Sequence, residues 1–268
     1  MQVLGLCRMS YPALGGFQTE HHTVEDRARF LYAPERMEAR LRAFEAFTLP
    51  ALKAQTDPDF TLVVVIGDDL PARWRDRITG LLEGLPQAVI RAMPPGRHRS
   101  IMQEVINDAR DGRPCIQFRM DDDDAVAVSF VARVRAAAAD VAGLVARNRL
   151  VAIDFNRGHS ARPCAQGIEA EAVARQFWVP SLAVVAAPAA RLTVMNFAHL
   201  KLWQFMPVLS LPDPDMFVRG LNDWNDSDLA AGPEARLLDA EGEALFRRAY
   251  GICADRVRAI YGGAAAAR

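Results

Sequence analysis

Residues 61–69 read TLVVVIGDD, an uninterrupted apolar run that ends in a glycine and two aspartates. A run of this length, rich in β-branched residues, predicts a strand that is buried on both faces. Asp57-Pro58-Asp59 predicts a turn before the strand, and Pro71 predicts the first turn of a helix after it. The stretch therefore indicates an interior strand of a parallel sheet that helices cover.

The same alternation of strand and helix recurs about four times before residue 147. Apolar runs predict further strands at residues 3–7, 88–93 and 115–118, and helical periodicity predicts helices at 34–55, after Pro71, after Ser100 and at 129–146. Pro50 should kink or divide the helix at 34–55. This order predicts an α/β fold with a mostly parallel, Rossmann-like central sheet.

The pattern is less regular outside these elements. Residues 11–33 are expected to form a long loop, and residues 196–225 show no clear period. Strands are predicted at 150–155 and 182–187, and a helix at 241–260.

Composition narrows the classes of protein that fit. The chain has 268 residues, 51% hydrophobic, and a formal net charge of −1, so no nucleic-acid partner is expected. We expect no signal peptide and no integral membrane segment, because no apolar run reaches the ~18 residues of a span. The four cysteines form no CxxC pair. A cytoplasmic protein without a zinc site is therefore predicted.

Polar side chains follow four predicted strands, each at the strand's carboxyl end. They are Arg8, then Asp68 and Asp69, then residues 97–99, then residues 121–124. Ligands of open parallel sheets bind beyond this edge. Arg97 and Arg99 can bind a diphosphate there. A solvated basic loop is the alternative interpretation of these two residues.

The four adjacent aspartates at 121–124 are the sharpest signal for chemistry. In an extended chain Asp121 and Asp123 would share one face, roughly 6–7 Å apart, with Asp122 and Asp124 on the other. Such a pair suits a hard divalent cation that also binds substrate phosphates. A solvated acidic turn is the alternative. A calcium EF-hand loop is excluded, because Ala125 occupies a ligand position.

Two segments resemble GT-A glycosyltransferases. QTDPDFTLVVVIGDDLP at 55–71 resembles their segment QTYPDFEIIVVDDGS, and FRMDDDDAV at 118–126 resembles their DxD motif. The chain as a whole is similar to a bacterial rhamnosyltransferase family. The matching stretches are QTDPDF, the loop at 94–99, QFRMDDDDAVAVSFV, DFNRG at 154–158, MNFAHLKLW at 195–203 and MFVRGLNDWNDS at 216–227.

This resemblance implies a GT-A domain over 1–240 and a helical appendage over 241–268. The nucleotide-binding part would span 1–146 and the acceptor part 147–240. The implied activity is transfer of a sugar, rhamnose by the family label, from a nucleotide-diphosphate donor to a saccharide or glycan, with inversion and with Mn²⁺ or Mg²⁺. The rival interpretations are a sugar nucleotidyltransferase and a non-catalytic module that binds carbohydrate or calcium.

The resemblance also implies roles for single residues. Asp68 would accept hydrogen bonds from the nucleotide base, with Asp69 as the alternative because the chain reads GDD instead of DDGS. Asp121 and Asp122 would contact the nucleotide. The expected metal ligands are Asp121, Asp123, Asp124 and His199. A hydrogen-bonded histidine among aromatic residues is an equal interpretation of His199.

The acceptor side is expected late in the chain, where an inverting transfer needs a carboxylate as base. Asp223 is the first candidate and Asp226 the second, with Asp154 and Asp215 next. An Asx turn or helix cap is the alternative for either of the first two. Trp224 is a candidate for stacking on a sugar or base.

Overall fold

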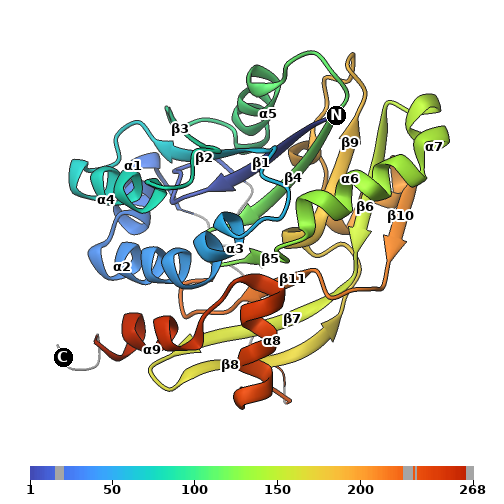
Figure 1. Ribbon diagram of the computed structural model, residues 1–268. Coiled ribbons are helices and arrows are strands. Elements are labelled where there is room, and N and C mark those ends of the chain that lie inside the picture. Colours follow the sequence, from blue (N-terminus) through green and yellow to red (C-terminus); the bar gives the residue numbers. More distant parts are fainter. Residues whose placement is uncertain (16–20, 226–231, 233, 264–268) are drawn as a thin grey trace.

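The computed structural model describes residues 1–15, 21–225, 232 and 234–263. Its centre is a seven-stranded sheet in the order β10-β6-β9-β4-β1-β2-β3 (Figure 1). The strands are β1 (Gln2–Arg8), β2 (Thr61–Gly67), β3 (Ala88–Met93), β4 (Cys115–Asp121), β6 (Leu150–Phe155), β9 (Leu182–Ala186) and β10 (Val208–Leu211). All pairs are parallel except those of β9 with β4 and β6. The mostly parallel α/β sheet expected of a GT-A fold is confirmed.

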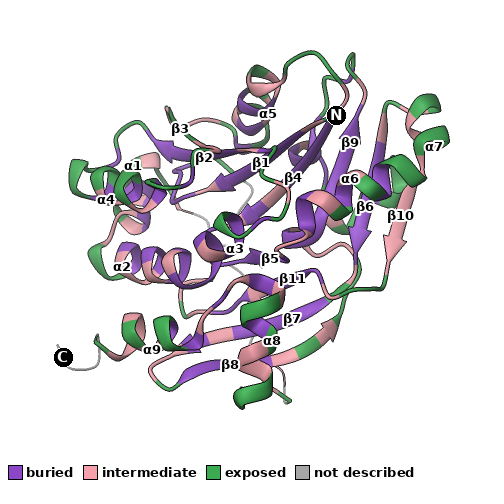
Figure 2. Cartoon of the chain, in the orientation of Figure 1, coloured by how far each residue is buried: buried purple, intermediate pink, exposed green. Residues whose placement is uncertain are grey.

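Alternate residues of the central strands enter two hydrophobic cores, one on each face of the sheet. Val64 and Ile66 of β2 pack with α2 (Pro34–Ala43), α3 (Leu49–Lys53), α4 (Ala72–Leu82) and α6 (Phe130–Asp140). Val63 and Val65 pack on the other face, with α5 (His98–Ala109). Figure 2 shows the resulting burial along β1, β2 and β4. Helices on both faces explain why the strands read as continuous apolar runs.

The helix predicted at 34–55 is divided, as Pro50 requires. A π-helical turn, Phe44–Thr48, separates α2 from α3. Pro50 has no N–H to donate to the carbonyl of Ala46, and this gap in the ladder explains the wider turn.

The segment predicted as a loop at 11–33 contains a helix, α1 (Val24–Leu31). Thr23 caps it by accepting a hydrogen bond from the Asp26 amide over 3.0 Å. The helix predicted at 129–146 is α6 followed by α7 (Ala142–Arg147). The last two helices are α8 (Ala240–Tyr250) and α9 (Ala254–Gly262).

A second sheet, ordered β12-β8-β7-β11-β5, is missing from the sequence-based prediction. Its strands are β5 (Ala125–Val126), β7 (Arg157–Cys164), β8 (Gly167–Ala174), β11 (Phe217–Gly220) and β12 (Arg236–Leu237). β5 follows the four aspartates directly and pairs with β11. This pairing places β11 beside the end of β4.

Among the described helices, none is long and apolar enough to cross a membrane.

Candidate active site

A pocket of about 290 Å³ lies where β1 and β4 end. Leu6 and Arg8 of β1, with Arg119 and Asp121 of β4, form its floor. The parallel register pairs Leu6 with Arg119 and Arg8 with Asp121, so the four side chains share one face of the sheet. The pocket therefore opens at the edge where ligands bind in open α/β sheets.

Segments from both halves of the chain form the walls of the pocket. The wall residues include Arg36, Arg40, His98, Trp178, Met195, His199, Arg219, Trp224 and Asn225. Three of the sequence-predicted aspartates, Asp121, Asp122 and Asp123, also line it. Part of the group of polar residues that the sequence predicts to meet at this edge therefore does line the pocket.

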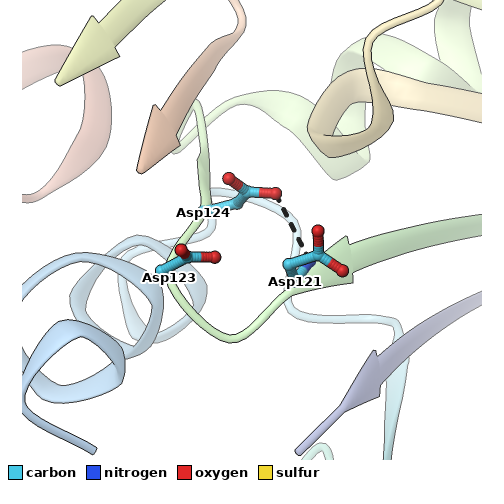
Figure 3. A group of neighbouring side chains, drawn as sticks. All are labelled: Asp121, Asp123 and Asp124. Carbon is cyan, nitrogen blue, oxygen red and sulfur yellow. Dashed lines mark hydrogen bonds between the residues drawn. The ribbon is translucent and has the colours of Figure 1, made fainter. Parts of the chain in front are cut away.

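The four aspartates, which we call the acid turn (Asp121–Asp124), do not continue the strand. The Asp124 amide donates to the Asp121 carbonyl over 3.2 Å and closes a turn. Expecting Asp124 to face away from Asp121 is therefore wrong, because the alternation of an extended chain stops with β4. Asp124 accepts a hydrogen bond from the Asp121 amide over 3.3 Å (Figure 3). Carboxylate oxygens of Asp121, Asp123 and Asp124 lie within 4.8 Å of one another.

Three of the four residues of the acid turn are buried, so a solvated acidic turn does not describe it. Asp122, Asp123 and Asp124 are at most 1% exposed. Arg40 of α2 donates to Asp122 and to Asp123, the latter over 3.1 Å. Burying adjacent carboxylates is costly unless cations and donors compensate them.

Arg219 of β11 supplies the second compensating cation. Its Nη1 donates to Asp121 Oδ2 over 3.0 Å and to Asp124 Oδ2 over 2.9 Å. The next residue, Gly220, donates its amide to Asp124 Oδ1 over 3.0 Å. A Cβ on Gly220 would lie 1.9 Å from the Asp123 carbonyl oxygen, so only glycine fits there. The second sheet thus holds the acid turn in place.

The electrostatics separate the two ends of the acid turn. Burial raises the pKa of Asp121, but Arg219, Arg8 and Arg40 outweigh it and hold that pKa below its ordinary value. Burial raises the pKa of Asp124 to about 8, with Arg219 opposing the shift and Asp123 adding to it. Asp121 is therefore a carboxylate at neutral pH, whereas burial and the neighbouring Asp123 make the charged form of Asp124 less favourable.

The chemistry of this donor set fits a divalent metal ion. All three clustered ligands offer carboxylate oxygen, which Mg²⁺ and Mn²⁺ prefer. Asp122 Oδ2 is also buried and has no hydrogen-bond partner among the described residues. Arg40 and Arg219 would share the carboxylates with such an ion.

His199 lines the same pocket, but it is not part of the carboxylate cluster found among the described residues. Its Nδ1 lies 2.6 Å from the Phe177 carbonyl oxygen, which can only accept, so Nδ1 carries the proton. Burial, then Arg119, lowers the pKa of His199. The imidazole is therefore neutral, and its Nε2, which accepts no hydrogen bond from the described residues, suits a metal or substrate ligand.

The residues predicted to bind the nucleotide are divided between the pocket and the rim of the sheet. Arg8 is in the floor of the pocket. Asp68 and Asp69 are exposed after β2 and do not line the pocket. Tyr32 donates its hydroxyl to Asp69 Oδ1 over 2.5 Å, whereas the Asp68 carboxylate accepts no hydrogen bond from the described side chains.

Arg97 and Arg99 are exposed and lie outside the pocket lining, whereas His98 between them is buried and lines it. Burial, then Arg8, lowers the pKa of His98 to about 3, so this ring is neutral. The helix begins at His98, not after Ser100, because Arg97 takes the N-cap position and its carbonyl accepts from the Ser100 amide.

The first candidate base, Asp223, does not line the described pocket. Asp223 is 87% exposed and pairs with Arg162 over 2.8 Å. Asp226 lies outside the described residues. The same turn nevertheless borders the site, because Asn222 Nδ2 donates to Asp123 Oδ2 over 2.7 Å and Trp224 lines the pocket.

Of the two remaining carboxylates, Asp154 is fully buried and accepts from the Phe177 amide and the Ser210 hydroxyl. Asp215 pairs with Arg157 over 3.4 Å. Both carboxylates therefore have partners within the fold.

Sequence reasoning found Arg8 but missed the other arginines of the pocket lining, which are Arg36, Arg40, Arg119 and Arg219. Arg36 and Arg40 are four residues apart on α2 and both buried, so they share one helical face. That spacing was the available signal, but charged residues on an amphipathic helix usually indicate a solvated face. Arg119 and Arg219 had no such signal.

Comparison with known proteins identifies the family. Residues 2–234 match the model of the family described as "Putative rhamnosyl transferase". The chain belongs to this family of glycosyltransferases. No curated protein matches the chain.

Solved structures show weak similarity. Residues 1–349 of S. aureus TarS are 10% identical, with a TM-score of 0.41, over 82% of this chain and 60% of that one. The same TarS fragment in complex with UDP-GlcNAc is 11% identical, with a TM-score of 0.44, over 87% of this chain and 63% of that one. A UDP-glucose pyrophosphorylase complexed with UDP-glucose is 9% identical, with a TM-score of 0.34. The chain thus spans about 60% of the length of the TarS fragment.

Proposed function

We propose that this chain is a metal-dependent glycosyltransferase that moves a sugar, rhamnose by the family's description, from a nucleotide-diphosphate donor to a saccharide hydroxyl. The observation that supports it is the buried cluster of Asp121, Asp123 and Asp124 in a pocket that arginines line at the carboxyl edge of the sheet. Family membership supports the transfer chemistry. The four free cysteines favour the cytoplasm as its compartment.

The donor is proposed to lie across the ends of β2, β1 and β4. Asp68, whose carboxylate is exposed at the rim, accepts hydrogen bonds from the base, since Asp69 already accepts from Tyr32. Arg8 faces the diphosphate from the floor of the pocket. Trp224 offers an aromatic face to the sugar. These contacts orient the anomeric carbon toward the acceptor side.

The metal would be held by Asp121, Asp123 and Asp124, with His199 as a further candidate. When bound, it stabilises the negative charge that develops on the departing diphosphate. Arg219 and Arg40 keep the carboxylates in position and limit their mutual repulsion. An acceptor hydroxyl attacks the anomeric carbon and gives its proton to a carboxylate of the chain.

Asp223 remains our first proposal for that base, with Asp226 as the second. Replacing the true base by asparagine is expected to lower the turnover number by about 10²–10⁴-fold while the donor still binds, because proton transfer matters only in the transition state. Turnover and donor affinity of Asp223→Asn and Asp226→Asn are compared directly. Near-normal turnover in both variants would place the base elsewhere.

The function itself is tested with a panel of nucleotide-diphosphate sugars and saccharide acceptors, by following release of the nucleoside diphosphate with and without Mn²⁺. The two rival interpretations predict other outcomes. A nucleotidyltransferase would release pyrophosphate from a nucleoside triphosphate and a sugar 1-phosphate. A binding module would leave every donor intact.

A further inference from the structure

Arg119 lines the pocket and forms no salt bridge with any carboxylate of the described residues. It is beside Leu6 in the register of β4 with β1 and two residues before Asp121, on the same face of the sheet. Its guanidinium makes no hydrogen bond and no salt bridge within the described residues, in contrast to the other arginines of the pocket.

The aspartates of the pocket already have other partners. Asp121 accepts from Arg219 and lies 3.9 Å from Arg8, and Asp123 accepts from Arg40. Asp122 accepts from Arg40 as well. Each carboxylate of the pocket lining is therefore engaged by an arginine other than Arg119.

The ring beside Arg119 cannot compensate its charge either. His98 lines the same pocket, and its Nε2 lies 3.1 Å from Arg8 Nη1. A guanidinium with five N–H donors is thus left facing a pocket in which no described group accepts from it. Placing an arginine partly out of water without an acceptor is unfavourable in the free protein, and an incoming anion would remove that cost.

We infer that Arg119 binds a phosphate group of a substrate, through hydrogen bonds from its guanidinium to the phosphate oxygens. Guanidinium and phosphate match in geometry and charge, and such bonds are about twice as strong as neutral ones. The phosphate belongs either to the diphosphate of the donor or to a phosphorylated acceptor. The choice between these sources rests on the proposed function, whereas the binding of phosphate by Arg119 does not.

The experiment is titration calorimetry of the full chain with three probes at constant Mn²⁺: pyrophosphate, UDP and uridine. Arg119→Leu is expected to weaken the binding of pyrophosphate and of UDP by about 10- to 100-fold and to leave the affinity for uridine unchanged. Arg119→Lys should lose less affinity for the phosphate probes than Arg119→Leu, since lysine keeps the charge but not the paired donors. Arg91→Leu, which removes an exposed arginine from β3, is the matched control and should bind all three probes normally.

Several outcomes separate the alternatives. Inorganic phosphate that binds the UDP-saturated wild type but not Arg119→Leu would place the phosphate on the acceptor. Equal affinity of wild type and Arg119→Leu for every phosphate probe would overturn the assignment of Arg119 and leave the proposed function standing. A wild type that binds no phosphate probe would overturn both. A purely structural role of Arg119 predicts that ligand-free Arg119→Leu melts at a lower temperature than the wild type. We expect no such decrease, because the substitution removes no hydrogen-bond partner among the described residues.

Discussion

Asp123→Asn is expected to lower the turnover number by about 10³-fold. The substitution removes one of three clustered carboxylates, and electrostatic stabilisation of the leaving group by a bound cation is worth several kcal/mol, where each 1.36 kcal/mol is a factor of ten. The residue is 1% exposed, and its carboxylate accepts from Arg40 and Asn222. Losing its charge should therefore also destabilise the fold, by about 1–3 kcal/mol.

Turnover is measured below the melting temperature of the variant, and circular dichroism checks that it is folded. Asp76→Asn, which neutralises an exposed aspartate of α4, is the control and should keep wild-type turnover. A folded Asp123→Asn that retains more than a tenth of the turnover would remove Asp123 from the metal site.

Gly220→Ala is expected to damage the site although it removes no polar group. The added Cβ would lie 1.9 Å from the carbonyl oxygen and 2.7 Å from the carbonyl carbon of Asp123, and backbone atoms cannot move aside as a flexible side chain can. Overpacking of this kind costs about 1–3 kcal/mol, and a shift of the acid turn by ~1 Å would lower turnover by about 10²-fold.

The matched control is Gly80→Ala in α4, where a Cβ would meet nothing within 4 Å. That change should stabilise the helix by about 0.5–1 kcal/mol. Melting temperature and turnover of the two variants are compared with wild type. If Gly220→Ala kept the wild-type melting temperature and turnover number, the result would contradict the close approach of β11 to the acid turn.

The sequence predicts the inner strands of the central sheet well because they are buried on both faces, whereas the half-buried edge strand β10 was not predicted. Residues 61–66 are continuously apolar, and this leaves no competing interpretation for β2. The strands β6 and β9 could be predicted for the same reason. In contrast, β7 carries Arg157, His159 and Ser160, so no apolar alternation marks it as a strand.

The acid turn could be located from sequence, but not its geometry or its partners. Four adjacent aspartates indicate a site, yet an extended strand and a turn give opposite orientations for Asp124. Arg40 is 83 residues away from Asp123, and Arg219 is 95 residues away from Asp124. The Arg219 contact depends on the pairing of β11 with β5, and the Arg40 contact on the packing of α2, and local periodicity encodes neither.

The most direct measurement is release of nucleoside diphosphate from uridine, thymidine and guanosine diphosphate sugars, each offered with saccharide acceptors. With Mn²⁺ present, we expect the chain to consume at least one donor and to form a glycoside, and we expect EDTA to stop the reaction. Complete inertness toward every donor would contradict the proposed transferase. Equal rates in Mn²⁺ and EDTA would contradict the metal-dependent role of Asp121, Asp123 and Asp124.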